Sequence, residues 1–432
     1  MKARSKRYAI AVVCIPLLLA GCQSGASRET AATKSPGTAV SSPSVSPSPT
    51  ATPSVAPTTQ ATGSLPPSSL SQKPSAAEPA QQQPLRLSGM SFLNSRQGWT
   101  AGDAAGSGTV WQTADGGQTW RGSALPVQHA GAIGFAGESR GWMTARTGCH
   151  EEKGQIVCAE WQLLRTDDGG LRFQTQTKGA PQKPAGQPAD DRVFVVSADK
   201  AFVIADTNLL ATADGGVNWR AVDFGIGPFL PEEGSFLADG RHGWVMGRAG
   251  KGCRTDVREA PDRCATTVVA TADGGAHWKM VWSPQDSTGL RTVGISFLDA
   301  KRGWMLILSI ESLQATLYGT TDGGAIWSAV SEMRGGRPYV RGLQFVDAAN
   351  GFIPLSAGAG PISGGLAKTT DGGKTFQRFV NEEQGWSFEQ LQFFSAREGW
   401  VRVSDPAGDY LQMTTDGGTS WRKSGLPAAR TS

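Results

Sequence analysis

Short runs of alternating apolar and polar residues fill the chain from residue 86 onward. Between residues 294 and 330 they are GISFLD, GWMLIL, ATLYGTT and AIWSAV, with turn residues between them. Alternation at a period of two is typical of half-buried β-strands, and no segment places its apolar residues at helical spacing. The pattern therefore predicts an all-β fold built from units of four short strands.

An eight-residue motif marks the period of these units. The sequence TTDGGAIW at residues 320–327 has six close copies, each Thr-x-Asp-Gly-Gly-x-x followed by Trp or Phe. Its aspartates recur every 45 to 59 residues, a spacing typical of propeller blades. They are Asp115, Asp168, Asp214, Asp273, Asp322, Asp371 and Asp416.

A second motif precedes each aspartate. It ends in Gly-Trp at Trp99, Trp142, Trp244, Trp304 and Trp400, with Phe202 and Phe352 in two degenerate copies. Ten of the fourteen tryptophans occupy the two repeat positions, so the aromatic residues form a packing system. A seven-bladed β-propeller is the best closure of seven such units, because a ring gives each blade two neighbours that cover its faces. The first and last blades are both complete, which predicts closure without strand exchange.

The N-terminus has the features of an export signal. Four basic residues precede an apolar stretch from Tyr8 to Leu19, which is too short to span a bilayer as a helix. The following Ala-Gly-Cys resembles the lipobox of bacterial lipoproteins. We therefore expect residues 1–21 to be a removable leader and Cys22 to carry a lipid on the outer face of a bacterial membrane. An ordinary cleavage site beside a chance cysteine is the alternative.

Residues 22–85 predict a tether. They are dense in Ser, Pro, Thr and Ala and almost free of large apolar residues, so this segment cannot bury enough surface to fold. The predicted propeller occupies residues 86–432. Four of the 41 basic residues lie in the leader, which leaves 37 basic and 37 acidic groups. An even balance of charge favours no nucleic-acid partner.

The Thr-x-Asp-Gly-Gly-x-x-aromatic motif resembles the Asp-box, or bacterial neuraminidase repeat, and we call it the Asp-box turn. The resemblance implies a turn between the third and fourth strands of each blade, in which the aspartate accepts hydrogen bonds from backbone N–H groups. Seven copies around a ring favour a structural turn over a catalytic or calcium site, since a catalytic acid has no reason to occur seven times.

The combination of the two motifs looks more like the photosystem II assembly and stability factor family. The resemblance covers residues 86 to 425. It implies a non-enzymatic seven-bladed propeller that holds a newly made membrane subunit through an arginine-rich patch. Related repeats also occur in exported proteins of bacteria without photosynthesis, and the long tether and two cysteine-containing insertions depart from the family. The resemblance therefore implies a binding or assembly platform and not a photosynthetic client.

Strand alternation assigns the turns to two faces. The turn between the first and second strands lies on the same face as the Asp-box turn, which we call the Asp-box face. Five blades carry an arginine there. These residues form a basic ring for an acidic partner, or each pairs with a nearby Asp-box carboxylate or solvates its turn. They are Arg96, Arg140, Arg241, Arg302 and Arg397. We call the opposite face, with its longer connections, the variable face.

Three connections of the variable face are candidate partner-binding sites. The first holds Arg334, Arg337, Tyr339 and Arg341. The second is expected to expose Phe229 with Phe224, Ile226 and Leu230 for docking of a protein, and the third holds Trp386 with Glu382 and Glu383. Packing of each connection against its own blade is the equally weighted alternative.

The four cysteines after Cys22 form two close pairs in equivalent connections of blades two and four. Cys149 with Cys158, and Cys253 with Cys264, are expected to be disulfides that stiffen these insertions in an oxidising compartment. A metal site is the alternative, but neither pair has C-x-x-C spacing, and His150 is the one nearby histidine.

The sequence offers no catalytic set, so we expect no enzyme, cofactor or metal. Sialidases use a tyrosine nucleophile among arginines, and of Tyr318, Tyr339 and Tyr410 only Tyr339 lies among arginines, all in one loop. Gly-x-Ser-x-Gly and His-Glu-x-x-His are absent from the sequence. We expect a tethered platform for a membrane or envelope protein. The alternative is a propeller that binds cell-wall glycan or acts as a glycosidase, since two catalytic acids need share no motif.

Overall fold

A computed structural model describes residues 85–104, 106–152, 155–179, 191–205, 207–250, 264–284, 289–333, 342–356, 364–380 and 386–426. The chain divides into two compact units, residues 1–74 and 75–432, and all described residues belong to the second. The predicted leader, Cys22 and tether lie outside the described residues. Across the described ranges all regular structure is β, and no helix there is long and apolar enough to cross a membrane.

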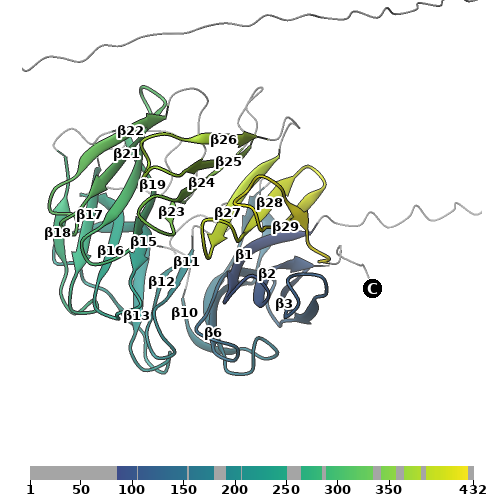
Figure 1. Cartoon of the computed structure of the whole chain (residues 1–432). Helices are drawn as coiled ribbons and strands as arrows, with labels where there is room; N and C mark the ends of the chain where they lie inside the picture. The colour runs from purple at the N-terminus through teal and green to yellow at the C-terminus, as the bar shows by residue number, and fades with distance from the viewer. Residues whose placement is uncertain are drawn as a thin grey trace, which may run out of the picture. The chain divides into compact units, whose positions relative to one another are not determined.

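Seven four-stranded antiparallel sheets follow one another along the chain as blades (Figure 1). Blade 1 contains β1 (Arg86–Phe92), β2 (Gly98–Ala104), β3 (Ser107–Thr113) and β4 (Arg121–Ala124). Blade 2 contains β5 (His129–Phe135), β6 (Gly141–Thr147), β9 (Glu160–Thr166) and β10 (Gln174–Gly179). Blade 3 contains β11 (Arg192–Val195), β12 (Ala201–Ala205), β13 (Asn208–Thr212) and β14 (Arg220–Ala221).

The remaining blades have the same strand order. Blade 4 contains β15 (Phe229–Phe236), β16 (Gly243–Ala249), β17 (Ala265–Thr271) and β18 (Lys279–Trp282). Blade 5 contains β19 (Leu290–Phe297), β20 (Gly303–Ser309), β21 (Gln314–Thr320) and β22 (Ser328–Met333). Blade 6 contains β23 (Gln344–Phe345), β24 (Gly351–Leu355), β25 (Gly365–Thr369) and β26 (Gln377–Val380). Blade 7 contains β27 (Ser387–Phe393), β28 (Gly399–Asp405), β29 (Gly408–Thr414) and β30 (Arg422–Lys423).

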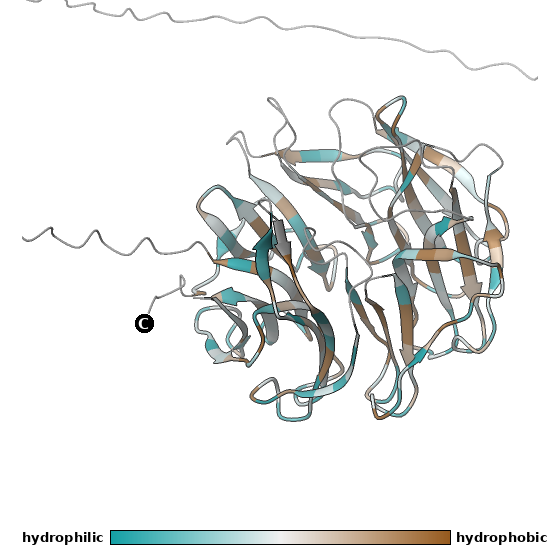
Figure 2. Ribbon diagram, turned by 180° about the vertical axis from the view of Figure 1, so that it is seen from behind, coloured by the Kyte–Doolittle hydropathy of each residue, from teal (hydrophilic) through white to brown (hydrophobic). Residues whose placement is uncertain are grey.

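The first strands of consecutive blades contact one another around a closed ring, and β27 of blade 7 contacts β1 of blade 1. Each sheet is formed by one continuous region of the chain, so the ring closes without strand exchange, as predicted. Apolar segments lie mainly within the strands (Figure 2). The middle strands are the most buried and the fourth strands the most exposed, as in β12 and β14. The predicted seven-bladed β-propeller is confirmed.

Stacked aromatic rings join six of the seven neighbouring blade pairs. In each pair the aromatic residue after the first turn lies flat on a phenylalanine in the first strand of the next blade, with ring centroids 3.5 to 4.4 Å apart. The Trp244–Phe297 pair is the most closely stacked, at 3.5 Å and 2°. The Asp-box tryptophan of the blade then packs edge-on against the same phenylalanine, as Trp327 does against Phe297. This arrangement explains the use of tryptophan at both repeat positions.

Side chains also hydrogen-bond directly from blade to blade. The residue before the stacked phenylalanine accepts a hydrogen bond of 2.7 to 3.0 Å from the phenylalanine N–H of the next blade, at Ser91, Ser235, Ser296, Gln344 and Gln392. Gln392 also donates its amide to the carbonyl of Phe92, at 2.8 Å. Its side chain therefore binds both backbone groups of Phe92 across the junction that closes the ring.

A β-bulge interrupts the pairing of first and second strands in five blades. The register shifts lie at Leu87/Gly89, Ala130/Ile133, Pro231/Glu233, Thr292/Gly294 and Phe388/Gln390. A bulge turns an additional side chain out of the strand alternation. In β15 the additional residue is Glu232, which forms part of the candidate site described below.

A small hairpin of β7 (His150–Glu152) and β8 (Gln155–Val157) is inserted between β6 and β9 of blade 2. Cys149 and Cys158 form a disulfide at its base, so this predicted pair is confirmed. Cys264 is also disulfide-bonded. Its predicted partner, Cys253, lies outside the described residues.

Candidate functional site

The seven Asp-box turns share one hydrogen-bond pattern. In blade 5 the buried Thr320 Oγ1 donates to Asp322 Oδ1 at 2.8 Å and accepts from the N–H of Gly324 at 3.0 Å. Asp322 Oδ1 then accepts from the N–H of Ile326 at 3.0 Å. The same three bonds occur in all seven turns.

Both glycines of every Asp-box turn have φ between 74° and 95°, a conformation that other residues resist. This geometry accounts for the Gly-Gly pair in each copy. The carboxylates therefore hold the turns together, and the structural interpretation of the motif is confirmed.

These hydrogen bonds also fix the charge of the Asp-box carboxylates. Bonds from the hydroxyl and backbone of Thr119 lower the pKa of Asp115 to about 2, and bonds from Asn218 lower that of Asp214 to about 2. The arginine of the same turn, Arg172, lowers the pKa of Asp168 to about 2. The pKa values of the other four are lowered as well. A carboxyl group that is ionised throughout the physiological range is unsuited to act as a general acid.

The Asp-box turns and the turns between first and second strands lie on one face, as predicted. In every blade the first glycine of the Asp-box turn donates its N–H to a carbonyl of the other turn, for example Gly323 to Lys301 at 2.8 Å. Arg140 pairs with Asp167 at 2.9 Å and with Asp199 at 3.4 Å. The other four arginines of this face are exposed, and their guanidinium groups make no hydrogen bond or ion pair within the described ranges.

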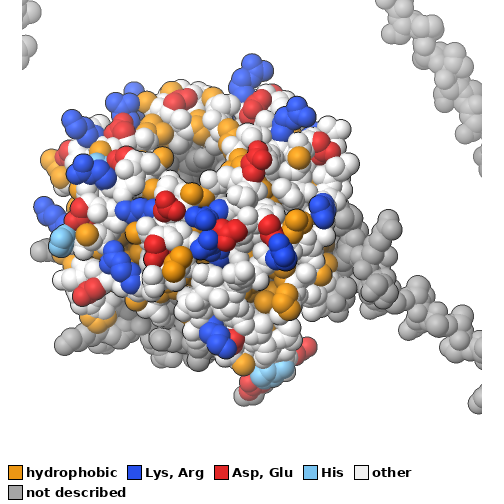
Figure 3. All heavy atoms as spheres, turned by 90° about the horizontal axis from the view of Figure 1, so that it is seen from below, with side chains coloured by type: hydrophobic (Ala, Val, Ile, Leu, Met, Phe, Trp, Pro, Cys, Tyr) orange, Lys and Arg blue, Asp and Glu red, His pale blue; other side chains and the backbone are white. Residues whose placement is uncertain are grey.

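We call these four residues the arginine quartet; they are Arg96, Arg241, Arg302 and Arg397. None of them pairs with an Asp-box carboxylate. Of the five arginines only Arg140 forms ion pairs, and its partners Asp167 and Asp199 are not Asp-box aspartates. Figure 3 shows basic and acidic side chains interspersed over one face of the molecule, so this face is not a field of one charge.

The predicted residues of the variable face separate into three groups. Arg334, Arg337, Tyr339 and Arg341 lie outside the described residues, in the connection between β22 and β23. Trp386 is buried, donates its indole N–H to the hydroxyl of Tyr410 at 2.7 Å, and packs on Phe388. Phe229 is half-buried, and its ring lies 4.7 Å from that of the buried Phe224.

Trp386 and Phe224 are thus packing residues, in agreement with the alternative that their connections pack against their own blades. The expectation that Phe224 is exposed is wrong, because the connection folds back so that this ring also contacts Trp278 at 5.2 Å. Leu230 and Ile226 are partly buried as well.

A set of ion pairs lies at the variable-face ends of the inner strands, and we call it the charged belt. Asp103 at the end of β2 meets His129 at the start of β5, with 2.6 Å between Oδ2 and Nδ1. Arg146 of β6 lies 3.3 Å from Asp191, which precedes β11. These pairs join blade 1 to blade 2 and blade 2 to blade 3.

The charged belt continues through the next blades. Arg192 of β11 binds Glu233 of β15 at 2.7 Å, and Arg248 of β16 binds the bulged Glu232 at 2.6 Å. Glu232 also accepts a hydrogen bond from Thr292 of blade 5. The side chains of Asp191 and Arg248 are only 5 % and 6 % exposed. Desolvated charges of this kind are tolerated when they are paired, so the belt fixes blades 1 to 5 against one another.

The charged belt also spans the junction that closes the ring. Asp409 of β29 accepts a hydrogen bond from the N–H of Leu87 at 2.8 Å, and Arg402 of β28 donates to the carbonyl of Leu87 at 2.8 Å. The belt cannot be recognised in the sequence, because its members occupy the ends of different strands and share no motif. The single available signal is that charged residues recur where first strands begin, as at Asp191 and Arg192.

The described part of the ring does not assemble a recognisable catalytic set. Each belt carboxylate lies beside a basic group, and hydrogen bonds lower the pKa values of the Asp-box carboxylates. The hydroxyl of Tyr410 is bound by Trp386, with Lys423 Nζ 3.8 Å from its ring centroid.

His129, Cys149 and Cys158 are close enough together to hold a metal. The two sulfurs are bonded to each other, however, so they offer no thiolate ligand.

The chain matches no family model and no curated protein. It is similar to solved propeller structures. One, titled YCF48 bound to D1 peptide, is 20% identical over 77% of this chain and 93% of that chain, with a TM-score of 0.50. YCF48 from Cyanidioschyzon merolae is 18% identical over 79% of this chain and 98% of that chain, with a TM-score of 0.51. A GH74 enzyme from Niastella koreensis is 13% identical over 79% of this chain and 60% of that chain, with a TM-score of 0.46. At these identities the likeness shows the propeller fold alone.

Proposed function

We propose that the chain is a non-enzymatic platform that binds a membrane or envelope protein, tethered by a lipid on Cys22 to the outer face of a bacterial membrane. The observation that carries the proposal is the internal use of the acidic groups in the ring. Asp-box carboxylates bind their own turns, and belt carboxylates bind bases of the same or a neighbouring blade. The ring then offers a partner its basic side chains and its connecting loops, which are held on a rigid frame.

The similarity to YCF48 supports the same proposal. One of those structures is titled as a complex with a D1 peptide, and the similarity extends over nearly the whole of that propeller. This chain also has two sets of arginines suited to an acidic segment, since guanidinium groups bind carboxylates with two parallel hydrogen bonds. One set is the arginine quartet, and the other is Arg334, Arg337 and Arg341 between β22 and β23.

We assign the partner site to the variable face. The arginines of the β22–β23 connection lie within eight residues of one another, whereas the arginine quartet is distributed over blades 1, 4, 5 and 7. A short segment of a client protein can contact the compact set at one time. The long connections of the variable face also suit binding, because loops carried on a rigid scaffold are common binding sites.

Two charge-reversal variants test this assignment. Arg334, Arg337 and Arg341 are each changed to Glu in one, and Arg96, Arg302 and Arg397 in the other, so that both change the net charge equally. We expect the first variant to capture at least about tenfold less of the partner, since several charged contacts are reversed. The second should capture it normally.

Circular dichroism and thermal unfolding of both variants provide the folding control. Normal capture by the first variant, or loss in the second alone, would contradict the assignment to the variable face. The alternative function is glycan binding or glycosidase activity. Retention of the protein on wall polysaccharide, with no protein partner captured, would replace the proposal with that alternative.

A further inference from the structure

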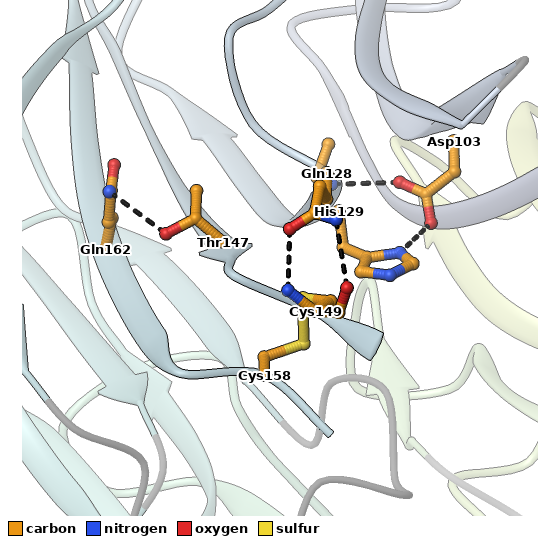
Figure 4. The surroundings of a disulfide bond; sticks show 8 residues. Asp103, Gln128, His129, Thr147, Cys149, Cys158 and Gln162 are labelled. Atoms are coloured by element: carbon orange, nitrogen blue, oxygen red, sulfur yellow. Dashed lines mark hydrogen bonds and ion pairs between the residues drawn. A yellow bond between two sulfur atoms is a disulfide. The ribbon is translucent and has the colours of Figure 1, made fainter. Parts of the chain in front are cut away.

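The disulfide of blade 2 lies beside an acid–histidine pair. A ring nitrogen of His129 and the two sulfur atoms of Cys149 and Cys158 lie within 4.8 Å of one another. The other side of the imidazole is held by Asp103, whose Oδ2 is 2.6 Å from Nδ1 of His129. Figure 4 shows the carboxylate, the imidazole and the disulfide together. A carboxylate that orients a histidine beside sulfur is the arrangement that activates nucleophilic cysteines.

We propose that Cys149–Cys158 is a redox-active disulfide that exchanges with an external dithiol, and that His129, oriented by Asp103, stabilises the thiolate released when the bond opens. This activity is independent of the proposed binding function. If the Cys149–Cys158 disulfide only stiffened the hairpin, it would not take part in thiol–disulfide exchange.

The charge on His129 is available near neutral pH. The hydrogen bond that His129 donates to the Asp103 carboxylate raises the pKa of His129, while burial and the charge of Arg146 oppose that change. Arg146 is itself neutralised by Asp191. The hairpin residues His150, Glu151 and Glu152 are exposed, so solvent screens their charges. A cation a few ångströms from sulfur lowers the pKa of a thiol and so favours its thiolate.

The exchange balances with one external dithiol. A thiolate of the dithiol attacks the sulfur of Cys149, which is the more exposed of the two, because Cys158 is buried. The disulfide bond breaks, and Cys158 leaves as a thiolate with the electron pair, beside the imidazolium of His129. The second thiol of the reductant then displaces Cys149. The dithiol becomes a disulfide: the proton of its first thiol has gone to solvent, that of its second passes to Cys149, and Cys158 remains a thiolate beside the imidazolium.

The backbone around the disulfide is held by other bonds, so the cysteines stay adjacent when the bond opens. The side-chain amide of Gln128 accepts a hydrogen bond from the N–H of Cys149 at 2.6 Å and donates to its carbonyl at 3.0 Å. On the other side, the N–H of Ala159 donates to the carbonyls of Thr147 and Gly148. These contacts make reoxidation to the same pair favourable, as reversible exchange requires.

The test measures the rate at which dithiothreitol reduces this disulfide between pH 5.5 and 9. Free thiols are trapped at successive times and the peptide containing Cys149 and Cys158 is quantified by mass spectrometry, with the Cys264 disulfide as an internal reference. In His129→Gln we expect the reduction rate to fall about threefold relative to the full wild-type chain near pH 6, because loss of an opposite charge at this distance raises the pKa of the Cys158 thiol by about one unit and a more basic thiolate leaves more slowly. The difference should disappear above the raised pKa of His129, where the imidazole is neutral.

Two further variants separate this role from a structural one. His277→Gln is the matched control, since His277 has the same 2.6 Å contact with an aspartate, in blade 4. It should behave as wild type. With Asp103→Asn, the difference between His129 and Gln at position 129 should disappear at a lower pH, because this variant lacks the group that raises the pKa of His129. Equal reduction of wild type and His129→Gln at every pH, or a difference that does not change with pH, would overturn the proposal.

Discussion

The buried threonine hydroxyl of each Asp-box turn makes three hydrogen bonds: it donates to the aspartate carboxylate and accepts from the N–H groups of that aspartate and of the second glycine. We predict that Thr320→Val destabilises the protein by about 1–3 kcal/mol, because the N–H of Gly324 is buried and loses its acceptor. The valine has nearly the same volume, so packing is preserved. The measurement is the denaturant midpoint of unfolding.

Thr316→Val in the same strand is the matched control, since that side chain is more exposed and outside the turn. If the two variants unfolded at the same denaturant concentration, the Asp-box hydroxyl would have no special role.

The lowered pKa values of the Asp-box aspartates predict loss of stability in acid. Asp115 has a pKa of about 2 in the folded ring, below the ordinary 3.8. A carboxyl with a depressed folded pKa stabilises the protein above its unfolded pKa, and that contribution disappears as pH falls through the folded value. We therefore expect the urea midpoint to fall steadily from about pH 4 to about pH 2. A midpoint that did not change over this range would show that the seven turns contribute little.

At the scale of the residue, the sequence predicts what repeats and misses what does not. The Asp-box turns could be predicted because seven copies specify the same Thr, Asp and Gly-Gly. Trp386 is a buried packing residue, although its sequence context was equally compatible with a surface site. An aromatic residue in a loop gives no signal of the partner that buries it, and here that partner is Tyr410, 24 residues away.

The blades are not equally joined to their neighbours. Val195 of β11 takes the place of the stacked phenylalanine, so Trp142 has no ring of blade 3 lying flat on it and meets only the edge of Trp219, and Gly134 supplies no side chain for the usual hydrogen bond to the next blade. Within the described ranges the indole N–H of Trp142 is buried without a hydrogen-bond partner. Two ion pairs cross this junction, but Arg140–Asp199 is exposed to solvent and contributes little, and Arg146–Asp191 lies at the variable-face end, where it does not replace the missing ring contact.

We predict that blade 3 opens more readily than the rest of the ring. In hydrogen-exchange mass spectrometry, amides of β12 and β13 should exchange on the order of tenfold faster than those of β20 and β21 in blade 5. Each missing contact lowers the free energy of local opening, and about 1.4 kcal/mol corresponds to tenfold. Blade 5 is the internal control, because Trp304 both stacks on Phe345 and donates its indole N–H to Gly372. Equal protection of the two blades would contradict this ranking.

The sequence shows at the element scale that blade 3 is degenerate, through Phe202 in place of Trp. Phe202 itself still stacks on Phe236, and the missing contact is that of Trp142 with Val195, about 50 positions apart along the chain, which the sequence does not show. The bulges in the first strands are similarly hidden. A bulge such as that at Glu232 changes the register by one residue, and the alternation of apolar residues around it is too short to reveal the change.

The whole ring combines one regular face with one irregular face. The Asp-box face repeats a single turn geometry seven times, and its carboxylates are engaged in those turns. The variable face carries the ends of the charged belt, the β7–β8 hairpin and the connection with Arg334, Arg337 and Arg341. A rigid ring with such a face suits a binding platform, since the frame fixes the positions of loops that can vary without disturbing the core.

Site-specific photocrosslinking on intact cells tests the central claim most directly. A photoreactive amino acid replaces Tyr339 or Glu311 at the variable face in two forms of the full chain, and Val217 or Ile326 at the Asp-box face in two others. Val217 and Ile326 are the most exposed large apolar side chains in the described part of the ring, so their replacement leaves the core intact. We predict that one membrane or envelope protein is crosslinked from the variable-face positions and not from the Asp-box positions. Crosslinking from the Asp-box positions alone, or to wall polymer alone, would contradict the account.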